Sequence, residues 1–93
     1  MKKEEVLRFL STNKKELKEK FKIKKIGIFG SILKKDNPED IDFYVEFEEK
    51  SFDNIAALWS YLEEKFKKID IYYPHKFSNK FILEKIKKEV IYG

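Results

Sequence analysis

The chain has 93 residues, no cysteine and a net charge of +4, and 42% of its residues are hydrophobic. This length suits one small domain, 1–93, with a single core, and the composition disfavours disorder. The lack of cysteine excludes a disulfide framework, thiolate metal sites and a cysteine nucleophile. No apolar run approaches the roughly 20 residues that span a bilayer, and MKKEEVLRFL does not look like a secretory signal, so we expect a cytoplasmic protein that does not enter a membrane.

The charges are distributed unevenly along the chain. Residues 1–35 hold 12 basic and 4 acidic residues, residues 36–64 hold 1 and 10, and residues 65–93 hold 8 and 3. An acidic centre between two basic flanks is not the basic stripe typical of nucleic-acid binding. It favours a site for cations or for a cationic partner.

The first part of the chain predicts a helix and a strand. A single amphipathic helix is expected over about residues 2–20, although the apolar pattern lapses at Asn13 and Lys14. The run Lys24–Gly30 (KKIGIFG) predicts a strand that ends in glycine. The apolar positions of the helix are Val6, Leu7, Leu10, Leu17 and Phe21.

The acidic centre predicts a second strand and a second long helix. The strand is Ile41–Glu48 (IDFYVEFE), and the turn-forming sequence 36–38 (DNP) precedes it. Ser51 is a candidate cap for the helix that follows. Its apolar face, which we expect in the core, consists of Ile55, Leu58, Trp59, Leu62 and Phe66.

The last third predicts one more strand and one more helix. The strand is Ile69–Tyr73 (IDIYY), stopped by Pro74, and the helix runs from about Asn79 nearly to the end. The order α-β-(short α)-β-α-β-α predicts an α/β (α+β) domain, with a small mixed sheet of about three strands covered by helices. The apolar positions assigned to the last helix are Phe77, Phe81, Ile82, Ile86, Val90 and Ile91.

Three aspartates are candidate metal ligands. Alternate side chains of a strand share a face, so Asp40 and Asp42 are expected on one side, about 6.5–7 Å apart. Asp70 joins them if the third strand lies beside the second. Two such charges repel by roughly 2.5 kcal/mol at an effective dielectric near 20, which favours a bound cation, and oxygen ligands favour Mg²⁺ or Mn²⁺. The alternative is that these are solvated outward positions of ordinary strands.

The Gly30-Ser31 pair is a candidate phosphate site. Glycine after a strand lets the backbone approach a ligand closely, and Ser31 offers a hydroxyl at the start of a short helix whose free N–H groups suit a phosphate. Lys34 and Lys35 follow one turn later and are candidates to add positive charge. The alternatives are a plain turn glycine, a helix-capping serine and two solvated lysines.

Together these motifs resemble a known family. A strand followed by Gly-Ser, a spacer, Asp-Ile-Asp, and a lone Asp in a third strand resemble the DNA polymerase β-like nucleotidyltransferase superfamily. The short length resembles its minimal nucleotidyltransferase (MNT) branch, the antitoxin halves of HEPN–MNT pairs. The resemblance covers nearly the whole chain, because IDIYYPHKF and ILEKIKKEVIYG also resemble the third strand and final helix of the branch.

The resemblance implies a reaction and a role for each matched residue. Gly30 and Ser31 would hold the terminal phosphates of a nucleoside triphosphate. Asp40 and Asp42 would bind the metals that bridge the triphosphate, and Asp70 would bind one metal and help to deprotonate the acceptor. In this branch a tyrosine hydroxyl of the HEPN toxin attacks the α-phosphate of ATP, and the transferred AMP silences the toxin.

One segment departs from the pattern of the branch and leaves alternatives open. Residues 32–35 are Ile-Leu-Lys-Lys where the branch carries a small or aromatic residue followed by Ala-Arg-Gly, and the spacer before the aspartates is shorter. A non-catalytic antitoxin that acts by binding its toxin is therefore a second hypothesis. A small nucleic-acid-binding module is a third, which the acidic centre disfavours. A partner chain, in a homo- or hetero-oligomer, is expected because no separate domain is present to select an acceptor.

Overall fold

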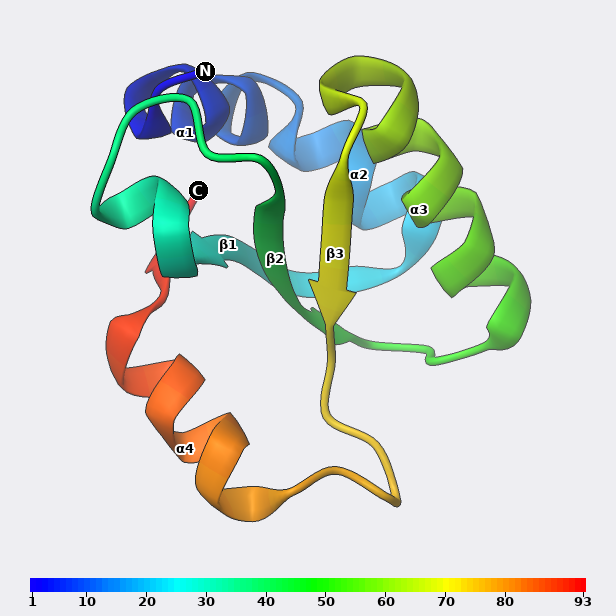
Figure 1. Cartoon of the computed structure of the whole chain (residues 1–93). Coiled ribbons are helices and arrows are strands. Elements are labelled where there is room, and N and C mark those ends of the chain that lie inside the picture. Colours follow the sequence, from blue (N-terminus) through cyan, green and yellow to red (C-terminus); the bar gives the residue numbers. More distant parts are fainter.

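A four-stranded mixed sheet organises the chain (Figure 1). The computed structural model describes all of residues 1–93. β2 pairs in parallel with β3, through the crossover helix that such a pair needs, and β1 pairs antiparallel with β2 and β4. The spatial order is β3-β2-β1-β4, and the strands are β1 (Ile23–Phe29), β2 (Ile41–Phe47), β3 (Ile69–Tyr72) and β4 (Ile91–Tyr92).

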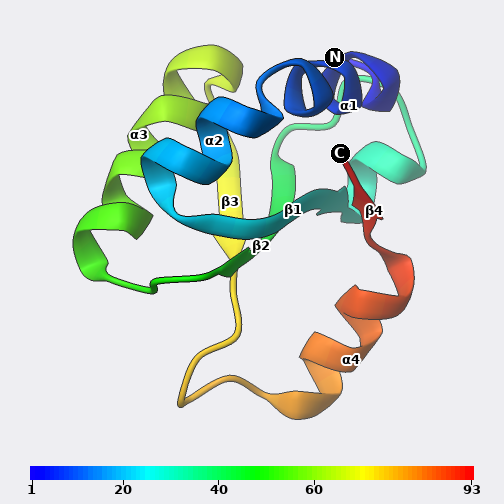
Figure 2. The same ribbon diagram turned by 180° about the vertical axis from the view of Figure 1, so that it is seen from behind.

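Three helices cover one face of this sheet. They are α1 (Lys3–Thr12), α2 (Lys14–Phe21) and the crossover helix α3 (Phe52–Phe66), which lie together on one side in both views (Figures 1 and 2). Their apolar side chains and alternate residues of β2, Ile41 and Phe43 among them, form the main core. The predicted α/β (α+β) class with a small mixed sheet is confirmed.

The opposite face of the sheet carries only α4 (Lys80–Glu89), which stands apart from the other helices (Figure 2). A small cluster of three buried residues, Phe29, Tyr44 and Ile86, joins this helix to the sheet. Asp42 and Asp70 lie on the same face and are half-buried. None of the helices combines the length and the apolar surface that a membrane span requires.

The prediction of one helix over residues 2–20 is wrong, because the structure has two helices that meet at Asn13. This residue caps the end of α1 and the start of α2, with φ −104° and ψ 13°. Its Nδ2 donates a hydrogen bond of 2.9 Å to the carbonyl oxygen of Phe9. A side-chain amide that bonds the preceding turn competes with the helical ladder, which explains the break.

The predicted last helix is present as Lys80–Glu89, with Asn79 as its N-cap, but Val90 and Ile91 do not belong to it. Residues 91–92 instead form a fourth strand, β4, which the sequence did not predict. The apolar positions assigned to the last helix differ in burial. Only Ile86 is buried, whereas the side chains of Phe81 and Ile82 are 85% and 54% exposed, because the main core lies on the other face of the sheet.

Candidate active site

The register of the parallel strands places two carboxylates side by side. Asp42 is the partner of Asp70 between β2 and β3, and Phe29 is the partner of Asp42 between β1 and β2. The isoleucines on both sides of Asp70, Ile69 and Ile71, are buried in the core, so alternation directs Asp70 to the opposite face. The sequence predicted this convergence of Asp42 and Asp70 on one face.

Gly30 and Ser31 begin a short 3₁₀ helix, η1 (Gly30–Leu33), directly after β1. Gly30 has φ +80°, a conformation that side chains rarely adopt, and a Cβ atom there would lie 2.5 Å from Oδ2 of Asp42. The backbone of the Gly-Ser turn therefore touches the carboxylate of Asp42. Glycine is required at this position for conformation and for space.

The amide of Gly30 already has an anionic partner. Glu89, in the last turn of α4, accepts a hydrogen bond of 2.8 Å from the Gly30 N–H at its Oε1 atom. Glu89 could not be predicted as a site residue from the sequence, since this contact joins residues that lie 59 positions apart. Helical spacing places Glu89 on the same side of α4 as Lys85 and Ile86. This spacing is the one sequence feature that relates Glu89 to the site, and it does not indicate that Gly30 is its hydrogen-bond partner.

An open cleft of about 340 Å³ joins these groups. Its walls include Ser31, Lys34 and Lys85, so two lysines line the same space as the carboxylates of Asp42 and Glu89, whereas Asp40 and Asp70 do not line it. Lys35 is exposed and does not line the cleft, so the structure separates the two lysines that the sequence treated alike. Lys85 was missed by sequence reasoning. The other lining residues are Phe29, Gly30, Asp42, Tyr72, Ile82, Ile86 and Glu89.

The surroundings of Asp42 disfavour its ionised form. Burial raises the pKa of the Asp42 carboxyl, and the nearby carboxylates of Asp70, Asp40 and Glu89 raise it further, in that order. The pKa of the Tyr72 hydroxyl is raised by burial and by the charges of Asp42 and Asp70. Several carboxylates therefore lie close together beside Asp42, which is an arrangement that a bound cation would stabilise.

Asp40 occupies a different position from Asp42. It precedes β2 by one residue and is exposed, yet it is close enough to act on the carboxyl of Asp42. No group of three His, Cys, Asp or Glu side chains is arranged to hold a metal ion. Mg²⁺ usually binds one or two carboxylates together with substrate phosphates rather than a complete protein cage. The oxygen donors of Asp42 and Asp70 fit that mode of binding.

Comparison with known proteins agrees with this geometry. The family model described as polymerase beta, nucleotidyltransferase matches residues 12–93. A protein of Methanocaldococcus jannaschii named "Putative protein adenylyltransferase MJ0126" is 34% identical over 92 residues, which cover 95% of this chain and 94% of the relative. "Protein adenylyltransferase MntA" of Thermococcus cleftensis is 41% identical over 63 residues, which cover 64% of each chain.

The chain belongs to the polymerase beta-type nucleotidyltransferase family. The family resemblance drawn from the Gly-Ser and Asp-Ile-Asp motifs is thereby confirmed, as is the prediction that the protein is a nucleotidyltransferase.

Proposed function

We propose that the protein transfers AMP from ATP to a tyrosine hydroxyl of a partner protein, a HEPN-type toxin, and acts as the antitoxin of that pair in the cytoplasm. The observation that carries the proposal is the pairing of Asp42 with Asp70 beside the Gly30-Ser31 turn. The names of the relatives support a protein as the acceptor.

The proposed reaction forms one phosphorus–oxygen bond and breaks another. The acceptor oxygen attacks the α-phosphorus of ATP, the bond from that phosphorus to the bridging oxygen of the β-phosphate breaks, and pyrophosphate leaves. Asp70 takes up the proton of the acceptor hydroxyl. Gly30 and Ser31 bind the terminal phosphates, and Lys34 offsets part of their charge from the wall of the cleft.

We propose that Asp42 and Asp70, with Asp40 at the rim, hold Mg²⁺ or Mn²⁺ together with the phosphates of the nucleotide. A divalent cation bound there would neutralise the phosphates and polarise the reacting α-phosphate. The protein supplies the two adjacent carboxylates on rigid strands. Burial is the main cause of the raised pKa of Asp42, and the repulsion from Asp70 and Asp40 that raises it further is what a cation would offset.

The proposal is tested by incubating the protein with α-labelled ATP, Mg²⁺ and the HEPN protein encoded beside it. We expect label on a tyrosine of the partner, with loss of at least about 100-fold in rate for Asp42→Asn and Asp70→Asn. EDTA should abolish the transfer, and added Mn²⁺ should restore it. Asp36→Asn, in an exposed turn, is the matched control. Equal labelling by Asp42→Asn and the wild type would contradict the proposal.

A second function is that the protein neutralises the toxin by binding alone. It is favoured by Glu89, whose carboxylate holds the Gly30 N–H that a phosphate needs, and by the Ile-Leu-Lys-Lys segment after Ser31. In this case Asp42→Asn would still rescue growth of cells that express the toxin. Loss of rescue by Asp42→Asn, with the complex of the two proteins intact on a sizing column, would exclude binding alone.

A further inference from the structure

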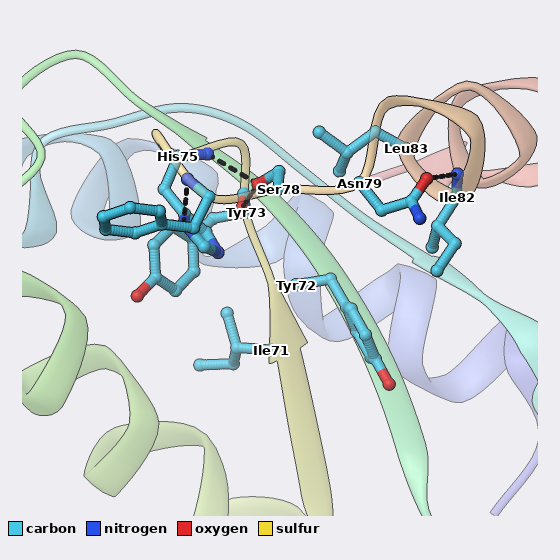
Figure 3. Close-up of a pocket in the computed structure, with 9 residues that line it drawn as sticks. Ile71, Tyr72, Tyr73, His75, Ser78, Asn79, Ile82 and Leu83 are labelled. Carbon is cyan, nitrogen blue, oxygen red and sulfur yellow. Dashed lines mark hydrogen bonds between the residues drawn. The ribbon is translucent and has the colours of Figure 1, made fainter.

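A second cavity lies beyond β3, beside the cleft that holds the carboxylates. It has a volume of about 240 Å³ and lies between the loop after β3 and the start of α4 (Figure 3). Figure 3 shows Tyr73, His75 and Ser78 on one side, and Asn79, Ile82 and Leu83 on the other. The cavity has an aromatic and aliphatic lining with a few polar atoms, which is typical of small-molecule sites.

The cavity and the cleft are neighbours. Tyr72 and Ile82 line both, so no other side chain separates the two spaces at that point. The strand directions show the order of the Gly-Ser turn, the carboxylates and the cavity along β2 and β3. β1 runs antiparallel to β2, so Gly30-Ser31 lies near the start of β2 and β3, whereas the cavity lies past the end of β3. Asp42 and Asp70 fall between them.

The walls of the cavity are held in place by contacts with the rest of the protein. The ring of Tyr73 packs edge-to-face on Phe47, with the centroids 6.1 Å apart, and lies 5.2 Å from the ring of His75. Tyr72 packs edge-to-face on Phe29, with the centroids 5.2 Å apart. These aromatic walls are therefore present before any ligand arrives.

The lining also includes an exposed aromatic ring and a free amide donor. Phe77 lines the cavity next to His75, whose Nδ1 accepts a hydrogen bond of 3.2 Å from the Phe77 N–H. Its ring is 84% exposed, and Nζ of Lys76 lies 5.8 Å from the ring centroid. Asn79 caps α4 by accepting hydrogen bonds from the N–H groups of Phe81 and Ile82 at Oδ1. Its Nδ2 atom makes no bond to the protein and is a donor for a ring nitrogen.

We propose that this cavity binds the base of the donor nucleotide, a planar nitrogenous ring, while the cleft binds its triphosphate. The proposal rests on the proposed function, since it places the nucleoside of the same donor. A nucleotide whose phosphates contact Gly30-Ser31 and whose α-phosphate lies beside Asp70 then extends past Tyr72 into the cavity. Aromatic side chains there stack on the base, and the contact favours nucleotides over inorganic polyphosphate.

The test compares two exposed phenylalanines at the same end of α4. Phe77 lines the cavity, whereas Phe81, which is 85% exposed, lines neither the cavity nor the cleft. ATP and inorganic tripolyphosphate, each with Mg²⁺, are titrated calorimetrically into the wild type, Phe77→Ala, Phe77→Tyr and Phe81→Ala. We expect Phe77→Ala to weaken ATP binding about tenfold and to leave tripolyphosphate binding unchanged. Phe77→Tyr and Phe81→Ala should bind both probes as the wild type does.

Three results would overturn the base site. They are unchanged ATP affinity in Phe77→Ala, an equal loss for ATP and tripolyphosphate, and an equal loss of ATP affinity in Phe81→Ala. Unchanged ATP affinity with reduced transfer to the partner protein would instead assign Phe77 to acceptor binding. The tripolyphosphate titration tests the phosphate site by itself. If the wild type binds ATP and tripolyphosphate equally well, the base site is excluded, whereas the proposed function is not.

Discussion

Oε1 of Glu89 accepts a hydrogen bond of 2.8 Å from the backbone N–H of Gly30, so a carboxylate of α4 occupies the amide of the Gly-Ser turn. An anionic oxygen at this amide is in the position proposed for an oxygen of a terminal phosphate. The carboxylate also raises the pKa of Asp42, so it adds to the negative charge of the cleft. In the proposed function, a phosphate that binds the Gly30 N–H would take the place of the Glu89 carboxylate.

Glu89→Gln is expected to strengthen the binding of tripolyphosphate and of ATP. The substitution keeps the size of the side chain and removes a charge, and like charges about 8 Å apart repel by about 2 kcal/mol at an effective dielectric near 20. We expect an increase in affinity of about tenfold, measured by calorimetry. Glu84→Gln, on an exposed position of the same helix, is the control. Weaker binding by Glu89→Gln would show that the carboxylate takes part in binding the nucleotide.

Gly30→Ala is expected to destabilise the protein for two separable reasons. The positive φ of residue 30 costs an alanine about 1–2 kcal/mol, and the new Cβ atom meets Oδ2 of Asp42 at 2.5 Å. Truncating the carboxylate in Gly30→Ala/Asp42→Ala relieves the contact and leaves the backbone strain. The rise in the urea midpoint caused by Asp42→Ala should therefore be larger in the Gly30→Ala background than in the wild-type background. Equal rises in the two backgrounds would exclude the contact.

Lys34 and Lys35 are expected to differ in their effect on triphosphate binding. Lys34 lines the cleft and Lys35 does not. Lys34→Ala should weaken tripolyphosphate binding about threefold to tenfold and reduce its dependence on salt, because one cation near the phosphates is lost. Lys35→Ala should bind as the wild type does. Equal losses in both variants would indicate a diffuse electrostatic attraction without a defined place for Lys34.

The raised pKa of Asp42 predicts how stability depends on pH in metal-free protein. The folded state holds the proton of Asp42 more tightly than the unfolded chain does, so the stabilisation is present at acidic pH and lost as the pH rises through the folded-state pKa. Asp42→Asn should therefore melt at a higher temperature than the wild type near neutral pH in EDTA. The difference should shrink as the pH falls. Asp36→Asn should show no such pH-dependent difference, and a lower melting temperature for Asp42→Asn at neutral pH would contradict the prediction.

Much of the sheet side of the site could be predicted from alternation along the strands. The isoleucines beside Asp70 fix which way that carboxylate points, and β2 and β3 were located to within one residue. The Gly-Ser turn was found because glycine follows a buried strand. The alternation and the Gly-Ser turn are local sequence patterns. The parallel pairing of β2 with β3 adds the register that brings Asp42 beside Asp70.

The α4 side of the site could not be predicted, because it depends on contacts between distant parts of the chain. Glu89 reaches Gly30 only because β4, two residues long, returns the chain to the edge of β1. Such a short strand has no periodicity to detect. Gly27 was its one signal, since a Cβ atom there would lie 2.5 Å from the carbonyl oxygen of Ile91. The apolar spacing of Phe81 and Ile82 predicted the helix and not its environment, since no part of the sheet covers these side chains.

The pairing of Asp42 with Asp70 also makes assembly of the site inseparable from correct folding. If β3 shifted by one residue along β2, alternation would turn Asp70 into the hydrophobic core and bring Ile69 and Ile71 to the other face. The cost of burying a charge and exposing two large apolar side chains disfavours that misfolded state. The two isoleucines thus select the strand register in which Asp42 and Asp70 are paired, so every correctly folded chain has these carboxylates side by side.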